Sequence, residues 1–113
     1  MADRLVAYAP RVDEDARAWV RWWRLDGLPE MRNLLWDKWD PLSLRGEAPE
    51  DEYDSYANVL ASKLRRGNTR HDIADYLTTC LSEDGIITPR WRQRCEDAAQ
   101  ALLDWYEQSD APR

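Results

Sequence analysis

The chain has 113 residues, of which 43% are hydrophobic and 34% are charged, a balance typical of one globular domain. Its formal net charge of −6 argues against a nucleic-acid-binding protein, because such proteins normally carry a basic surface. No apolar run has the length of a transmembrane helix, and the N-terminal segment lacks the apolar core of a signal peptide. We therefore expect a cytoplasmic protein that binds neither a membrane nor a nucleic acid.

Helix caps, glycine and proline stops, and apolar spacings of three and four predict an all-α fold. We expect a single domain over residues 1–113, a bundle of about five helices with no strand. Residues 1–12 should form an irregular lead-in, and residues 109–113 should fray. The expected helices between these ends span residues 13–25, 29–39, 51–66, 70–83 and 89–108.

Glycine and proline residues place a break between the first two expected helices. Gly27 fits the position just beyond a helix end, and Pro29 fits the first position of the next helix. In the helix before this break, the inward stripe should contain Trp19, Val20 and Trp23.

Two later helix starts carry capping patterns. Thr69 and Asp72 have the spacing of a capping box, with Asp in place of the usual Glu. Thr88 is a favourable N-cap, and Pro89 after it suits the first helical position. These patterns predict where the last two helices begin.

The chain has seven tryptophans and five tyrosines but no phenylalanine. Trp22 and Trp36 fit the inward stripes less well than the other tryptophans, and we expect Trp22 to be partly exposed. An exposed Trp is favoured at interface hot spots, because its ring offers a large contact area at a low entropic cost. Trp36 stands one turn before an acidic loop, so it is our candidate anchor for a partner. The tryptophans interpreted as core residues are Trp19, Trp23, Trp39, Trp91 and Trp105.

Acidic residues are concentrated between Asp37 and Asp54, where seven acids and two bases contribute −5 of the net charge. A helix N-terminus favours acids, which accounts for residues 50–52 but not for the acids that precede them. A loop and a helix start that carry these acids would present one negative surface able to steer a basic partner. The candidate partner-binding residues are Trp36, Asp37, Asp40, Glu47, Glu50, Asp51 and Asp54.

Sequence motifs in this region form a recognisable pattern. Trp-Asp-Pro-Leu at residues 39–42 is followed by Asp-Glu-Tyr-Asp-Ser-Tyr at residues 51–56 and by Ala-Asp-Tyr-Leu at residues 74–77. The pattern resembles that of a group of small bacterial helical proteins, most of them uncharacterised, over residues 34–81. After the proline the group commonly has Ile or Phe with Gly, where this chain has Leu42 and Ser43. The group is similar in size and style to immunity proteins that accompany secreted bacterial toxins, which implies a helical fold and an immunity role.

The acidic stretch and the resemblance lead us to expect a protein-binding immunity protein, or antitoxin, rather than an enzyme. Its acidic surface would cover a basic surface on a cognate protein toxin. A nuclease is the candidate toxin, because its active site must bind phosphates and an acidic loop can occupy that site as a substrate mimic. We expect no cofactor. A structural or regulatory subunit with another protein partner is a further interpretation that the sequence does not separate from this one.

An enzymatic alternative rests on two aspartate pairs. Asp51 with Asp54, and Asp72 with Asp75, are each spaced i, i+3 on consecutive expected helices. Carboxylates placed in this way on facing helices can hold Mg²⁺. All-helical nucleotide pyrophosphohydrolases use a similar pattern, so a Mg²⁺-dependent nucleotide pyrophosphohydrolase is the alternative function.

Nucleophilic catalysis has little support in the sequence. His71 is the only histidine, and it lies away from both cysteines along the chain. We interpret it as an ordinary surface residue. In a reducing cytoplasm, Cys80 and Cys95 should be small buried hydrophobic residues rather than a disulfide.

Overall fold

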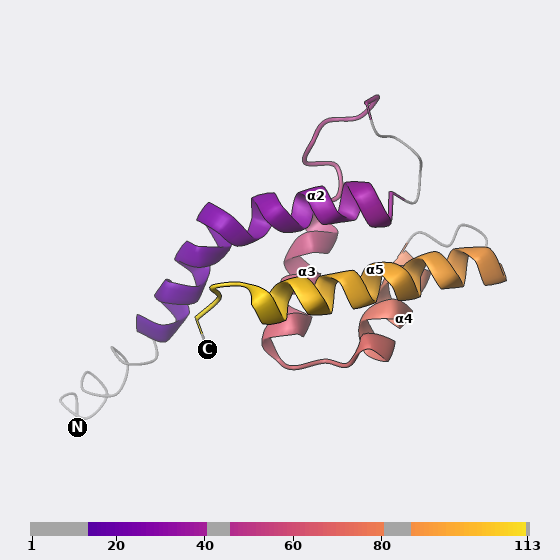
Figure 1. Cartoon of the computed structure of the whole chain (residues 1–113). Coiled ribbons are helices and arrows are strands. Elements are labelled where there is room, and N and C mark those ends of the chain that lie inside the picture. Colours follow the sequence, from indigo (N-terminus) through magenta and orange to yellow (C-terminus); the bar gives the residue numbers. More distant parts are fainter. Residues whose placement is uncertain (1–13, 41–45, 81–86, 113) are drawn as a thin grey trace, which may run out of the picture.

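The computed structural model describes residues 14–40, 46–80 and 87–112. Within these ranges the chain is an all-α globule of four helices without a strand, which confirms the predicted fold class (Figure 1). The expected lead-in at residues 1–12 and the predicted helix end at residues 81–83 lie outside the described residues.

The first helix runs without a break over residues 14–38 and contains a π-helical turn. Residues 14–22 are α-helical, η1 covers Trp23–Gly27 and α2 covers Leu28–Lys38. In the π-helical turn, the backbone N–H of Leu28 donates to the carbonyl of Trp23, an i to i−5 bond. The break predicted at this point is therefore wrong, and two expected helices form one continuous helix that bends along its length (Figure 1).

Gly27 does not end a helix; its missing side chain leaves space for two indole rings. Its φ of −62° is helical, but a Cβ atom there would lie 2.6 Å from Cε3 of Trp23 and 2.9 Å from the Trp22 ring. Trp22 and Trp23 are only 8% and 7% exposed, so the expectation of a partly exposed Trp22 is wrong. The π-helical turn changes the helical phase, and two consecutive tryptophans can face the core. Val20, which was expected to point inward, is 43% exposed.

The remaining helices follow in the predicted order. α3 spans Asp54–Arg65 and begins later than predicted, because hydrogen-bonded turns occupy residues 49–54. α4 spans Arg70–Cys80, and α5 spans Pro89–Gln108 as predicted. α5 packs against both α4 and α2, and α2 also packs against α3 (Figure 1).

Both predicted capping patterns are present. The backbone N–H of Asp72 donates to Oγ1 of Thr69 at 3.2 Å, and the backbone N–H of Thr69 donates to Oδ2 of Asp72 at 3.1 Å. The hydroxyl of Thr88 accepts a 3.0 Å hydrogen bond from the backbone N–H of Trp91. These bonds satisfy N–H groups that have no partner within their own helix, which explains why both starts lie where the sequence predicts.

Aromatic side chains form two clusters around the aliphatic core. Ring centroids in the first, the N-terminal aromatic cluster, are 5.7 to 6.3 Å apart, and its members are Trp19, Trp22, Trp23, Trp105 and Tyr106. Centroids in the second, the turn-side aromatic cluster, are 4.7 to 6.4 Å apart, and its members are Trp36, Trp39, Tyr53, Tyr56 and Trp91. The first joins residues 14–23 to α5, and the second joins the end of α2 to the start of α3 and to α5.

Indole N–H groups connect segments that are far apart in the sequence. Trp23 donates to Oδ1 of Asn58 at 3.0 Å, and Trp105 donates to Oε1 of Glu30 at 2.9 Å. Among the buried side-chain N and O atoms of the described residues, Nε1 of Trp39 is the one without a hydrogen-bond partner. The tryptophans therefore position the helices by directed hydrogen bonds as well as by the apolar surface area that they bury.

Hydrogen bonds connect the residues after α5 to the end of that helix. The hydroxyl of Ser109 donates to the carbonyl of Tyr106 at 2.6 Å and accepts from the backbone N–H of Ala111 at 3.3 Å. Ala111 is only 6% exposed, so these bonds fold the tail against the body. Residue 113 lies outside the described residues, and the fraying expected of residues 109–113 stays a prediction.

Candidate protein-binding surface

The chain leaves α2 through a left-handed residue. Asp40 has a φ of +29°, a region in which Asp is several-fold enriched over most residues. The backbone N–H groups of Trp39 and Asp40 both donate to the carbonyl of Leu35, at 3.0 and 2.8 Å. The phenol of Tyr53 donates to Oδ1 of Asp40 at 2.7 Å. The Asp40 carboxylate therefore braces the end of α2 against the start of α3.

Trp36 supports the segment that carries the acids. Its indole N–H donates to the backbone carbonyl of Glu50 at 2.9 Å. Its ring lies 4.7 Å from the ring of Tyr53, and the side chain is partly buried. The side chain predicted to be an exposed anchor thus holds the acidic segment against α2.

Asp54 forms a bidentate ion pair with Arg32 of α2. Nη2 of Arg32 lies 2.7 Å from Oδ2 of Asp54, and its Nε lies 3.0 Å from Oδ1. This hydrogen bonding raises the pKa of Arg32 above its ordinary value, and the charges of Glu50 and Asp51 add to the effect. Sequence reasoning missed Arg32, although it precedes Trp36 by one helical turn on the same face of α2.

Four carboxylates are exposed between these supports. The backbone N–H of Glu52 donates to the carbonyl of Pro49 at 3.1 Å, and that of Asp54 donates to the carbonyl of Asp51 at 3.0 Å. None of the four forms an ion pair with another described residue. We call them the acidic turn: Glu47, Glu50, Asp51 and Glu52.

The structure divides the predicted partner-binding residues into two groups. Three of them lie in the acidic turn, and Asp37 is exposed on the last turn of α2. Asp40 and Asp54 have structural partners, as described above. Glu52, which was counted in the acidic stretch but not among the candidates, joins the exposed group.

The two aspartate pairs of the enzymatic alternative do not come together. α3 has 12 residues and is about 18 Å long, and it separates Asp54 from the turn that leads to Asp72. Hydrogen bonds from the backbone N–H and the hydroxyl of Thr69 lower the pKa of Asp72, which acts as a cap. Among the described residues, no group of three or more His, Cys, Asp or Glu side chains is arranged to hold a metal ion.

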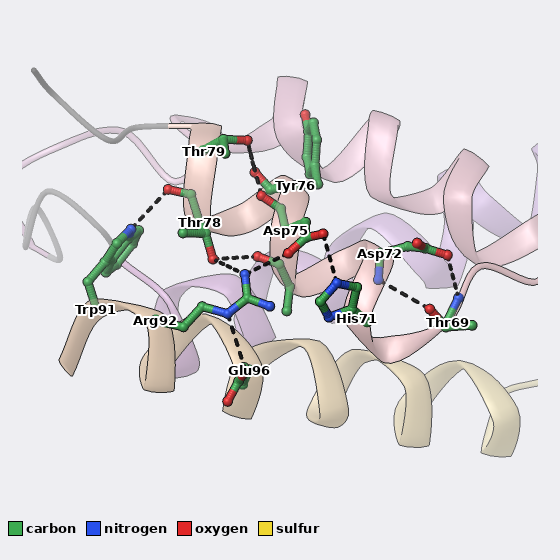
Figure 2. Close-up of polar contacts among 11 residues, drawn as sticks. Thr69, His71, Asp72, Asp75, Tyr76, Thr78, Thr79, Trp91, Arg92 and Glu96 are labelled. Atoms are coloured by element: carbon green, nitrogen blue, oxygen red, sulfur yellow. Dashed lines mark hydrogen bonds and ion pairs between the residues drawn. The ribbon is translucent and has the colours of Figure 1, made fainter. Parts of the chain in front are cut away.

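Asp75 belongs to a polar network that ties α4 to α5 (Figure 2). Nη1 of Arg92 donates to Oδ1 of Asp75 at 2.8 Å and to Oγ1 of Thr78 at 3.0 Å. Nε of Arg92 donates to Oε1 of Glu96 at 3.2 Å. The bond to Asp75 raises the pKa of Arg92, so the guanidinium stays charged. Nε2 of His71 lies 3.2 Å from Oδ2 of the same aspartate. This arrangement fastens two helices together.

Both cysteines are free thiols in protected surroundings. Cys95 is buried and Cys80 is partly buried. Burial raises the pKa of each thiol, which favours the protonated, weakly nucleophilic form. Their placement agrees with the expectation of small hydrophobic residues.

No helix of the described residues is long and apolar enough to span a membrane. No protein-family model, curated protein or solved structure matches the chain. Function is therefore inferred from the chain's own residues and their geometry.

Proposed function

We propose that the chain is an immunity protein, an antitoxin that binds and neutralises a bacterial toxin through its acidic turn. The observation that carries the proposal is a set of four exposed carboxylates without ion pairs among the described residues. Their backbone is held in hydrogen-bonded turns and fixed to α2 by Trp36.

This arrangement favours a basic protein as the partner. Like charges held close together repel one another, and a partner that brings basic groups relieves that repulsion. A concentrated negative surface also steers a basic partner and raises the association rate. Because the backbone is already held in place, binding orders little additional chain, which reduces the entropic cost of association.

A nuclease toxin fits this chemistry best. Its substrate is a polyanion, so its active site must present positive charge to phosphates. Carboxylates at the spacing of a turn can occupy that site in place of phosphates. The resemblance over residues 34–81 to small bacterial helical proteins supports the same role. Because the toxin must be neutralised before it reaches nucleic acid, the proposed immunity protein acts in the cytoplasm.

Affinity capture with a matched pair of variants tests the proposal. The acidic-turn variant carries Glu47→Gln, Glu50→Gln, Asp51→Asn and Glu52→Gln. The control variant loses the same charge at exposed positions elsewhere, through Asp26→Asn, Asp97→Asn, Asp104→Asn and Asp110→Asn. Each tagged protein is incubated at low and at high salt with a lysate of the bacterium that encodes it, and captured proteins are identified by mass spectrometry.

The unmodified chain and the control variant should capture the same basic protein in stoichiometric amount, and high salt should release it. The acidic-turn variant should lose it. The captured protein should be toxic to cells when produced alone and harmless when produced with the unmodified chain. A partner that the acidic-turn variant retains at both salt concentrations would overturn the proposed mechanism.

A further inference from the structure

A cavity of about 550 Å³ opens beside the acidic turn, between α2 and residues 46–50. Its volume falls in the range of roughly 300–1,000 Å³ that is usual for ligand pockets. It is lined from α2 by Pro29, Arg32, Asn33 and Trp36, and from the other side by Gly46, Ala48 and Glu50.

The described charges around the cavity leave it negative. Arg32 is the one cation among the described lining residues, and both oxygens of Asp54 hold it at 2.7 and 3.0 Å. With this pair neutralised, Glu50 is the remaining charged residue among the described lining residues, and the charges of Glu50 and Asp51 both help to raise the pKa of Arg32. The carboxylates of this region thus already stabilise one cation, and the exposed ones form no ion pair with another described residue.

Trp36 gives the cavity an aromatic wall. The ring is fixed by its N–H bond to the backbone carbonyl of Glu50 and by its contact with Tyr53. An indole face attracts cations more strongly than the other aromatic side chains do, because the faces of its π system are negative. A guanidinium suits such a wall better than an ammonium does, because it is planar and can stack while its N–H groups reach a carboxylate.

We propose that this cavity receives an arginine side chain of the partner protein. The guanidinium stacks on the indole of Trp36, and its N–H groups bind the carboxylate of Glu50. The inference rests on the proposed function for the source of the arginine, and on the cavity alone for its chemistry. The pocket would supply the anchor of the interface, and the rest of the acidic turn would supply long-range attraction.

A peptide titration of the isolated chain tests the chemistry without the toxin. The probe is a blocked Gly-Arg-Gly-Arg-Gly peptide, and the matched control peptide has citrulline, a neutral isostere, in place of each arginine. The readout is the indole N–H signals of the seven tryptophans in a ¹H–¹⁵N correlation spectrum. Comparison with the spectrum of a Trp36→Phe variant assigns the Trp36 signal.

The arginine peptide should shift the Trp36 signal in a saturable manner and leave the signals of Trp19 and Trp23 unchanged. The citrulline peptide should shift none. Glu50→Gln should weaken binding by about fivefold without moving Trp36, because the backbone carbonyl that holds the indole is retained. Trp36→Leu, which has no Trp36 indole signal and is followed through the backbone N–H signals of the same spectrum, should weaken it by a similar factor of about fivefold. Asp110→Asn, which removes an exposed charge elsewhere, should leave binding unchanged.

Equal shifts with both peptides, or unchanged affinity in Glu50→Gln, would overturn the arginine pocket. That failure leaves the proposed function intact if the acidic-turn variant still loses its captured partner. Conversely, arginine binding at Trp36 without any captured toxin would retain the pocket and reject the immunity role. If Trp36→Leu does not fold, Glu50→Gln alone decides the outcome.

Discussion

The two aromatic clusters use the same residue types for different purposes. In the N-terminal aromatic cluster, Trp19, Trp22 and Trp23 are each less than 9% exposed, and the rings close on one another and on α5. In the turn-side aromatic cluster, Trp39 and Tyr53 are similarly buried, at 1% and 2%. Trp36 of the same cluster, however, is only partly buried and lines a cavity beside four exposed carboxylates.

The difference shows that aromatic side chains stabilise the core in one region and hold the exposed acidic turn in place in the other. The N-terminal aromatic cluster is packed so closely that a single added Cβ at Gly27 would clash with it. The turn-side aromatic cluster instead holds a charged segment in place by hydrogen bonds, from Trp36 to Glu50 and from Tyr53 to Asp40. Changes in the first should therefore alter folding, and changes around the second should alter binding.

Gly27→Ala should give the largest effect on stability. The added Cβ would lie 2.6 Å from a rigid indole carbon, and overpacking of a tight core costs about 1–3 kcal/mol. We expect a loss near the upper end of that range in urea unfolding. Ser62→Ala, an exposed change on α3, should stay within about 0.5 kcal/mol of the unmodified chain. A Gly27→Ala protein as stable as the original would contradict the account of the π-helical turn.

Tyr53→Phe should give an intermediate effect. It removes the 2.7 Å hydrogen bond to Asp40 and should cost about 1 kcal/mol of unfolding free energy. Tyr56→Phe is the matched control, because Tyr56 belongs to the same cluster. If the two variants are equally stable in urea unfolding, the brace between α2 and α3 contributes nothing measurable.

The acidic-turn variant should leave stability within about 0.5 kcal/mol of the original while abolishing the salt-dependent capture. Its four side chains are exposed and have no ion pairs with described residues, so their charge should contribute little to the free energy of unfolding. Urea unfolding and capture are measured on the same preparations. A large loss of stability would mean that the acidic turn is structural, and the contrast between the two regions would disappear.

The smallest effect is expected at the capping box, which belongs to neither cluster. Hydrogen bonds from Thr69 lower the pKa of Asp72 in the folded chain. A carboxylate with a lowered pKa stabilises the fold above its ordinary pKa, and that stabilisation is lost as the pH falls through the folded value. Asp72→Asn should therefore be slightly less stable than the original at neutral pH, and the difference should shrink below about pH 4. If the stability difference between Asp72→Asn and the original chain grew as the pH fell, the predicted direction of the pH dependence would be wrong.

The sequence predicted those features whose causes are local. The caps at Thr69 and Thr88 and the range of α5 follow from residues within one helical turn, and all are confirmed. The continuous first helix could not be predicted, because its cause is tertiary: two indole rings lie against Gly27. Gly27 and Pro29 together were interpreted as a helix end and a new helix start, and that interpretation was wrong.

The same division applies to the candidate site. The net charge of a stretch follows from its residue types, so residues 37–54 alone predicted the acidic region. The partners of Asp40 and Asp54 are 13 and 22 residues away, and only the fold reveals that these two acids are engaged. The cavity and its Arg32 were likewise hidden, since both depend on how residues 46–50 lie against α2.

The most direct test of the central claim is capture by the acidic-turn variant beside the control variant of equal charge, at low and at high salt. The account predicts that the control retains a salt-sensitive basic partner and that the acidic-turn variant loses it, with both proteins fully folded. Equal recovery of that partner by the two variants would mean that its binding does not use the acidic turn.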